Sequence, residues 1–99
     1  MSAVECCQCG GDAENVASIS GSIMGDEYTE VYGFCGSCQV YTVVIWREPL
    51  DAEATSHVTG PVPKTEGDEK VSLIRKCDRP WDKRCRCKSH RAYFGGWLD

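Results

Sequence analysis

The sequence predicts a small β-rich fold of the α+β class, in which antiparallel strands precede a short C-terminal helix and metal ions supply part of the stability. Three observations lead to this prediction. The chain has only 99 residues, so the core that it can bury is small. It contains eight cysteines, most of them in closely spaced groups. Its clearest apolar segments have the composition and alternation of strands.

The expected strands are short segments rich in β-branched, aromatic or alternating small residues, over 16–20, 28–34, 39–46 and 71–74. Two glycines within residues 21–26 favour a hairpin connection between the first two strands. Residues 88–94 predict a helix, because Gly95 and Gly96 provide a suitable stop directly after it.

Composition divides the chain into three parts. Residues 1–50 form the predicted β lobe, and residues 71–99 form a basic metal-binding lobe. Between them, residues 51–70 are rich in Asp, Glu, Thr, Ser, Gly and Pro, which predicts a mobile loop or linker.

The formal net charge of −4 conceals an uneven distribution of charge. Residues 1–69 carry two basic and twelve acidic side chains, whereas residues 70–99 carry nine basic and three acidic ones. Such asymmetry indicates an interaction surface. A solvated basic face that folds against the acidic half of the same chain explains it equally well.

The N-terminus lacks the basic stretch and apolar run of a secretory signal, so we expect a reducing, cytoplasmic environment. In such a compartment, closely spaced cysteines bind metals or carry out redox chemistry more often than they form structural disulfides. The longest apolar stretch, residues 40–46, is far shorter than the roughly 20 residues that cross a bilayer. No membrane span is therefore expected.

The first group of predicted metal ligands consists of two cysteine pairs, Cys6 with Cys9 and Cys35 with Cys38. Two residues separate the members of each pair, and the 25 residues between the pairs suffice for a hairpin. This spacing is typical of a tetrahedral four-thiolate zinc site. Cys7 is an alternative to Cys6, but only one residue would then separate it from Cys9, so we interpret Cys7 as a free side chain.

With these two turns, residues 6–46 resemble a zinc ribbon, a small antiparallel β unit in which one metal ion joins two cysteine turns. The resemblance implies a structural zinc ion but no particular task, since zinc ribbons occur in transcription, RNA-processing and ribosomal proteins and in small subunits of metabolic enzymes. The turns are also similar to those of rubredoxin, which holds iron between paired Cys-x-x-Cys-Gly turns. Gly10 matches that pattern, whereas Gln39 occupies the position of the second glycine.

The second group of predicted ligands lies within 14 residues and comprises Cys77, Cys85, Cys87 and His90. Zinc accepts three thiolates and one imidazole. His90 follows Cys87 by three residues, so a helix that begins there projects both side chains from one face. His57 has no such neighbours, and we expect it in solvent. An iron–sulfur protein is the alternative for the cysteines, although the compact cysteine run of bacterial ferredoxins is missing.

Basic and aromatic side chains alternate along the C-terminal part, as in Trp81, Arg84, Arg86, Lys88, Tyr93, Phe94 and Trp97. Such side chains suit an acidic groove on another protein, or the phosphates and bases of a nucleic acid. Packing of the rings around the second metal explains them without any partner. The acidity of the whole chain favours a protein partner over a nucleic acid.

No catalytic site is recognisable, because both groups offer four full ligands and neither a phosphate-binding loop nor a catalytic triad is present. We therefore expect no enzymatic activity from the chain alone. The predicted function is that of a structural protein that binds two zinc ions and docks, as a small subunit or adaptor, on a larger protein or enzyme complex. A nucleic-acid-binding zinc protein is the first alternative, and a rubredoxin-like or iron–sulfur electron carrier is the second.

Overall fold

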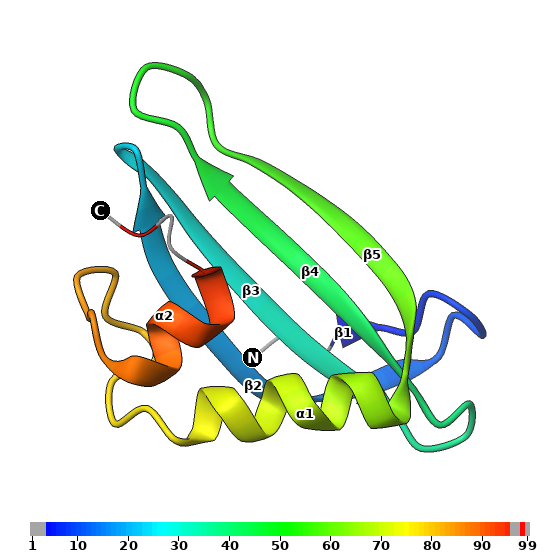
Figure 1. Ribbon diagram of the computed structural model, residues 1–99. Helices are drawn as coiled ribbons and strands as arrows, with labels where there is room; N and C mark the ends of the chain where they lie inside the picture. Colours follow the sequence, from blue (N-terminus) through cyan, green and yellow to red (C-terminus); the bar gives the residue numbers. More distant parts are fainter. Residues whose placement is uncertain (1–3, 96–97, 99) are drawn as a thin grey trace.

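A computed structural model of the protein describes residues 4–95 and residue 98. Five antiparallel strands form one sheet in the order of the sequence, and two helices follow them (Figure 1). The strands are β1 (Val4–Glu5), β2 (Asp12–Ile23), β3 (Asp26–Cys35), β4 (Val40–Glu48) and β5 (Thr55–Pro63), and the helices are α1 (Lys64–Arg75) and α2 (Lys88–Phe94). Neither helix combines the length and the apolar character that crossing a membrane requires.

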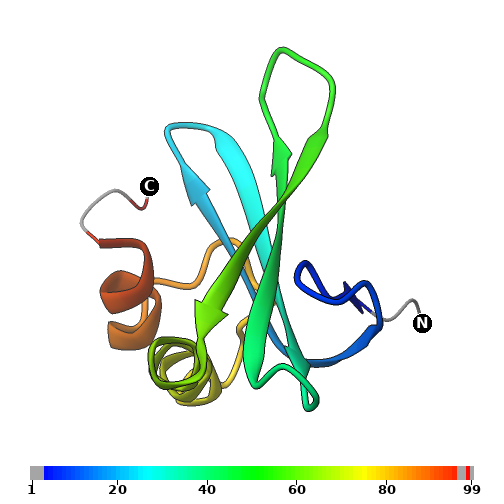
Figure 2. The same ribbon diagram turned by 90° about the vertical axis from the view of Figure 1, so that its right-hand side faces the viewer.

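The strongly twisted sheet separates two layers of packing. Figure 2 shows both helices on one side of the sheet and the N-terminal segment on the other. The larger core lies on the helical side and contains Ile19, Tyr32, Tyr41, Val43, Val71 and Ile74. A smaller core on the opposite side contains Val4, Cys6, Ala13 and Cys35. Since the larger core draws residues from both halves of the chain, the C-terminal segment packs directly on the sheet.

The predicted strands at 16–20, 28–34 and 39–46 are confirmed, because they lie within β2, β3 and β4. The hairpin between β2 and β3 is tighter than expected, with only Met24 and Gly25 in its turn. Both residues have positive φ angles, 53° and 86°, as a two-residue turn that matches the twist of the strands requires. The predicted helix over 88–94 is confirmed as α2, and Gly95 follows it with a φ of 73°. Gly96 and Trp97 lie outside the described residues.

The prediction of a loop or linker over 51–70 is wrong. Residues 55–63 form β5, which pairs with β4, and α1 begins at Lys64. The prediction of a strand over 71–74 is also wrong, because these residues belong to α1. β5 lacks the usual apolar signal because almost all of its residues are exposed, and its stability comes from the backbone pairing with β4.

Helix α1 packs on the sheet through a narrow stripe. Its buried residues are Gly67, Val71 and Ile74, which recur at the spacing of one helix face. A Cβ atom at Gly67 would overlap the ring of Tyr41 on β4. The hydroxyl of Tyr41 donates a hydrogen bond of 2.5 Å to Asp68 in the same helix. The absence of a side chain at Gly67 therefore allows the helix to approach the sheet closely.

We predict that Gly67→Ala destabilises the protein by about 1–3 kcal/mol, because the added methyl group must displace the Tyr41 ring. In an exposed helix, the same substitution would stabilise by roughly 0.5–1 kcal/mol. Thermal unfolding of the metal-loaded protein measures the difference. Gly36→Ala is the matched control, since an added Cβ there meets no atom within 4 Å. An unchanged or higher Tm for Gly67→Ala would contradict this packing.

Candidate metal centres

The first candidate centre brings together the side chains of Cys6, Cys9, Cys35 and Cys38. Their four sulfur atoms all lie within 4.8 Å of one another. The Sγ atoms of Cys9 and Cys35 are 3.8 Å apart. Four sulfurs at about 2.3 Å from a single tetrahedral ion would be separated by about 3.8 Å. The cluster therefore has the dimensions of a four-thiolate metal site.

The two turns that carry these cysteines share one backbone geometry. The N–H of Gly10 donates to the carbonyl of Cys6 (2.9 Å), and the N–H of Gln39 donates to the carbonyl of Cys35 (2.8 Å). Gly10 has a φ of 77° and Gln39 a φ of 57°, both in the left-handed region. The side chain of Gln39 also donates to the carbonyl of Gly36 (2.6 Å). Gln39 therefore completes the second turn in the position where a glycine was expected.

The cysteines of this centre have strongly divided proton affinities. Backbone N–H groups of Cys9 and Gln8, together with neighbouring thiols, lower the pKa of Cys6 to about 6. The hydrogen bond with Cys9, together with burial, raises the pKa of Cys38 to about 12. Adjacent sulfurs share protons in this way because several thiolates repel one another at short range. A divalent cation removes that repulsion by replacing the protons.

Cys7 lies outside this cluster. It is exposed, whereas Cys6 is buried, with only 2% of its surface accessible. The backbone N–H of Cys7 donates to the hydroxyl of Thr42 on β4 (2.9 Å), which ties the first cysteine turn to the sheet. The four-sulfur set thus includes Cys6 and leaves out Cys7, as the spacing predicted.

The second candidate centre brings together Cys77, Cys85, Cys87 and His90, again with all four ligand atoms within 4.8 Å of one another. The Sγ of Cys77 lies 3.7 Å from that of Cys85 and 3.4 Å from that of Cys87. The Nδ1 atom of His90 lies 3.2 Å from the Cys77 sulfur and 3.5 Å from the Cys87 sulfur. The group therefore offers three sulfurs and one ring nitrogen to a single ion.

Helix α2 begins at this centre. The Cys87 sulfur accepts a hydrogen bond from the backbone N–H of His90 (3.4 Å) and caps the helix, so one turn of α2 positions two of the ligands. The backbone N–H of Arg79 points to the Cys77 sulfur in the same manner (3.4 Å). Burial alone would raise the pKa of Cys87, but hydrogen bonds from His90 and from neighbouring thiols lower it to about 6. Burial raises the pKa of Cys77 to about 12.

His90 joins the second centre to the sheet. Its side chain is completely buried, and its Nε2 atom lies 2.9 Å from the carbonyl oxygen of Ser20 on β2. A carbonyl only accepts hydrogen bonds, so Nε2 carries a proton, and in a neutral imidazole Nδ1, which faces the sulfurs, is then the nitrogen that can bind a metal ion. A hydrogen bond of this kind orients most histidine ligands of metals.

Ser20 is a functional residue that the sequence did not reveal. Its N–H donates to the carbonyl of Pro80 (2.7 Å), and its carbonyl faces His90. Pro80 and His90, which belong to the segment of the second centre, therefore contact the backbone N–H and the backbone carbonyl of the same residue of β2. Because these contacts involve the Ser20 backbone, no side-chain pattern could have indicated them.

The two centres lie on opposite sides of the sheet. In Figures 1 and 2 the turns of the first centre lie to the right, and the segment of the second lies to the left, beside α2.

All eight cysteines are free thiols. Three or four sulfurs with at most one imidazole match the ligand preference of zinc, and all four ligand positions of each tetrahedron come from the protein. His57, the other histidine, is exposed on β5, as expected.

Substitution of Cys6 and of Cys7 separates the two possible ligand assignments. We predict that Cys6→Ser loses the metal of the first centre and unfolds the N-terminal turns, because small zinc units derive roughly 10–16 kcal/mol from metal binding. Cys7→Ser should retain both metals. Elemental analysis with circular dichroism measures both properties. Loss of metal from Cys7→Ser, with retention in Cys6→Ser, would show that the assignment is wrong.

Substitution of the two histidines provides a second test. We expect His90→Ala to lose the second metal while keeping the first, and to free the segment at 77–87 from β2, because the ligand and the contact with Ser20 disappear together. His57→Ala, which removes an exposed imidazole, should change neither the metal content nor the amide exchange of Ser20. Metal analysis and hydrogen exchange report the result. Two bound metals in His90→Ala would rule out His90 as a ligand.

Comparison with known proteins identifies no relative of the chain. No family model, no curated protein and no solved structure matches it.

Proposed function

We propose that the protein is a structural zinc protein that docks, as a small subunit or adaptor, on a larger protein. The observation that carries this proposal is the presence of two complete four-ligand groups in a chain with a small core. Each group has dimensions suited to zinc, and each fixes a turn or loop that has little apolar packing of its own. Zinc in such closed sites stabilises a fold and leaves no coordination position for a substrate.

An exposed apolar surface supports the docking role. Its members are large side chains with accessible fractions of 83% for Met24, 74% for Leu50, 58% for Val58 and 48% for Trp46. Asp26 holds the two hairpin ends together, since it accepts hydrogen bonds from Arg47 (2.7 Å) and from the N–H of Leu50 (3.2 Å). We call these four exposed residues the hairpin surface, and large exposed apolar side chains of this kind are typical of surfaces that protein partners cover.

The edge strand β5 extends this surface. In the described chain it pairs only with β4, and residues 55–63 contain no charged side chain. Natural edge strands that remain uncovered are usually protected by charges or bulges. Pro61 and Pro63 protect only the far end of β5, so the part that adjoins the hairpin surface suits a protein that covers both.

Paired substitutions test the docking role. We expect the tagged wild-type chain, isolated from its own cells, to elute in a stoichiometric complex well above its mass of 10.9 kDa. Trp46→Glu with Leu50→Glu should release the partner, since full burial of one large apolar side chain contributes about 1.5–3 kcal/mol and a buried, unpaired carboxylate opposes binding. The control, Thr65→Glu with Ser72→Glu, adds the same charge on exposed positions of α1. A wild-type chain that elutes alone, or equal loss of the partner in both variants, would refute the adaptor role.

A further inference from the structure

An open pocket lies beside the β2–β3 hairpin and is lined in part by residues 81–86. Its volume is about 680 Å³, and the described residues that line it are Ser22, Glu27, Trp81, Asp82, Lys83, Arg84 and Arg86. The residues around the sulfur cluster line a different cavity, which includes Cys77, Cys85 and Cys87. Residues 77–87 therefore contribute to two different cavities, one around the candidate metal ligands and one lined by basic side chains.

The alternation Arg84-Cys85-Arg86-Cys87 produces this division. Cys85 and Cys87 belong to the metal cluster, whereas Arg84 and Arg86 line the pocket. The Nη1 atom of Arg86 donates to the carbonyls of Lys83 (3.4 Å) and Cys85 (3.2 Å), which fixes its guanidinium against the loop. Among the described residues, neither guanidinium forms an ion pair with a carboxylate. The guanidinium of Arg86, held on the loop, and that of Arg84 are thus both available to an anionic ligand.

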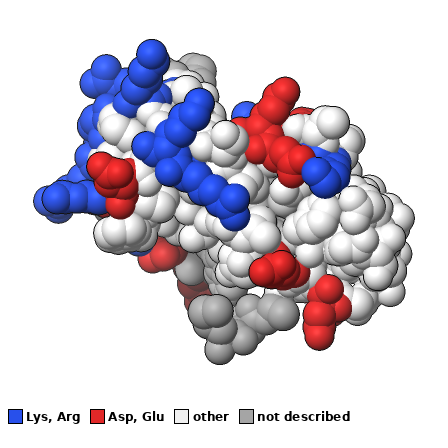
Figure 3. Space-filling model, turned by 90° about the horizontal axis from the view of Figure 1, so that it is seen from below, with Lys and Arg blue, Asp and Glu red and all other residues white. Residues whose placement is uncertain are grey.

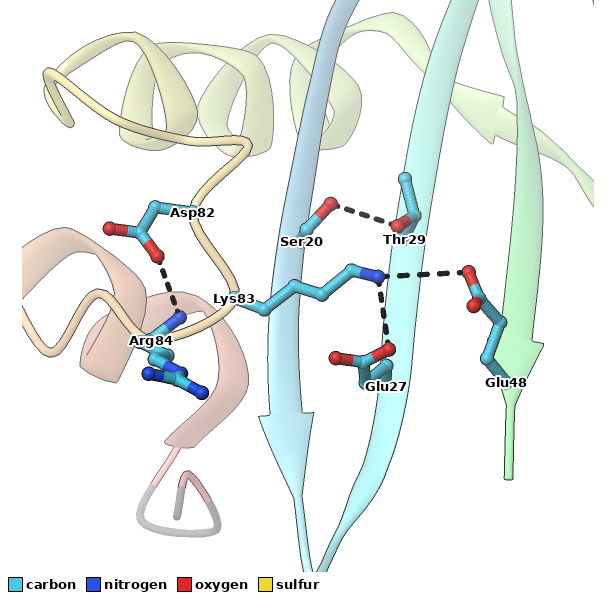
Figure 4. Close-up of polar contacts among 7 residues, drawn as sticks. All are labelled: Ser20, Glu27, Thr29, Glu48, Asp82, Lys83 and Arg84. Atoms are coloured by element: carbon cyan, nitrogen blue, oxygen red, sulfur yellow. Dashed lines mark hydrogen bonds and ion pairs between the residues drawn. The ribbon is translucent and has the colours of Figure 1, made fainter. Parts of the chain in front are cut away.

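The acidic residues of the pocket are largely engaged by other groups. Figure 4 shows Lys83 reaching across β2 to two carboxylates, at 3.0 Å from Glu27 and 3.7 Å from Glu48. Asp82 accepts a hydrogen bond from the backbone N–H of Arg84 (2.9 Å), while the Arg84 guanidinium projects away from it. Lys83 therefore offsets part of the negative charge of Glu27, and the lining as a whole contains three basic and two acidic side chains.

The surrounding segment strengthens the positive field. Residues 75–91 contain eight basic and two acidic side chains. Figure 3 shows Lys and Arg gathered chiefly at one side of the face that carries α1, with most of the visible Asp and Glu elsewhere. A cluster of this kind attracts phosphate and retains it best where two arginines can share its oxygens.

Trp81 adds an aromatic surface to this anion site. Its side chain is 68% exposed although it lines the pocket, so an indole face is available for stacking. The volume lies within the range of sites for small molecules. An aromatic ring beside two arginines suits a ligand with both a planar base and a phosphate. The carboxylate oxygens of Glu27 and Asp82 can accept hydrogen bonds from hydroxyl or amino groups.

We propose that this pocket binds a nucleoside phosphate, with its base on Trp81 and its phosphate on Arg84 and Arg86. The second metal centre determines the position of the arginines, because Cys85 and Cys87 flank Arg86 in the chain. Removal of that metal therefore abolishes binding. A free mononucleotide and the end of a single-stranded RNA present the same chemistry to the pocket.

Calorimetric titration of the full chain, with both centres loaded with zinc, tests this proposal. AMP is expected to bind saturably with a dissociation constant below about 1 mM, whereas adenosine and inorganic phosphate should each bind at least about tenfold more weakly. A single-stranded RNA hexamer that binds more tightly than AMP, and that AMP displaces, identifies an RNA end as the source of the ligand. Absence of saturable binding by both AMP and the hexamer would overturn the proposal.

Three variants locate the site. Arg84→Gln with Arg86→Gln, and separately Trp81→Leu, should each weaken AMP binding at least about tenfold, as loss of charge-assisted contacts or of stacking requires. Lys76→Gln with Arg91→Gln removes the same charge from exposed positions that do not line the pocket, and should weaken binding less than about threefold. Zinc content shows that each variant is folded. Equal weakening in the control, an unaffected Trp81→Leu, or displacement of AMP by a poly-glutamate peptide would show that the pocket does not recognise a nucleoside phosphate.

Discussion

Convergence of sulfur atoms from separate turns is the constraint on which the structure depends. Cys6 and Cys9 of the N-terminal turn meet Cys35 and Cys38 of the β3–β4 turn, at distances that four thiolates would tolerate only around a cation. The opposing pKa directions within the cluster follow from the same crowding, since one thiol releases its proton readily while another retains it. A metal ion converts this repulsion into a cross-link between the N-terminal segment and the β3–β4 turn.

The second centre applies the same constraint at the other side of the sheet. The ring of His90 directs Nδ1 to the cysteine sulfurs and Nε2 to the carbonyl of Ser20, so one buried side chain connects the candidate metal site to β2. Arg84 and Arg86 alternate with two of its cysteines in the chain. A metal ion bound at this centre would therefore constrain the segment that carries both arginines.

The sequence predicted the parts of the molecule that depend on local chemistry. The cysteines of both candidate metal groups followed from their spacing, His90 followed from its place three residues after Cys87, and α2 followed from the helical character of residues 88–94 and the glycine after them. The missed elements depend on tertiary context. β5 is a polar strand whose exposed residues carry no alternation, so only its pairing with β4 reveals it. Helix α1 was missed because one of its three buried positions is Gly67, where an apolar side chain would have made the helical spacing visible. Without it, residues 71–74 alone resembled a strand.

X-ray absorption spectroscopy of the protein, purified without added metal, tests the central claim most directly, because it identifies the element and its ligands together. If both centres hold zinc, the average zinc ion should have about 3.5 sulfur neighbours at about 2.3 Å and about 0.5 nitrogen neighbours at about 2.0–2.1 Å. Absorption at the iron edge, or a zinc shell made mainly of oxygen and nitrogen, would contradict the account.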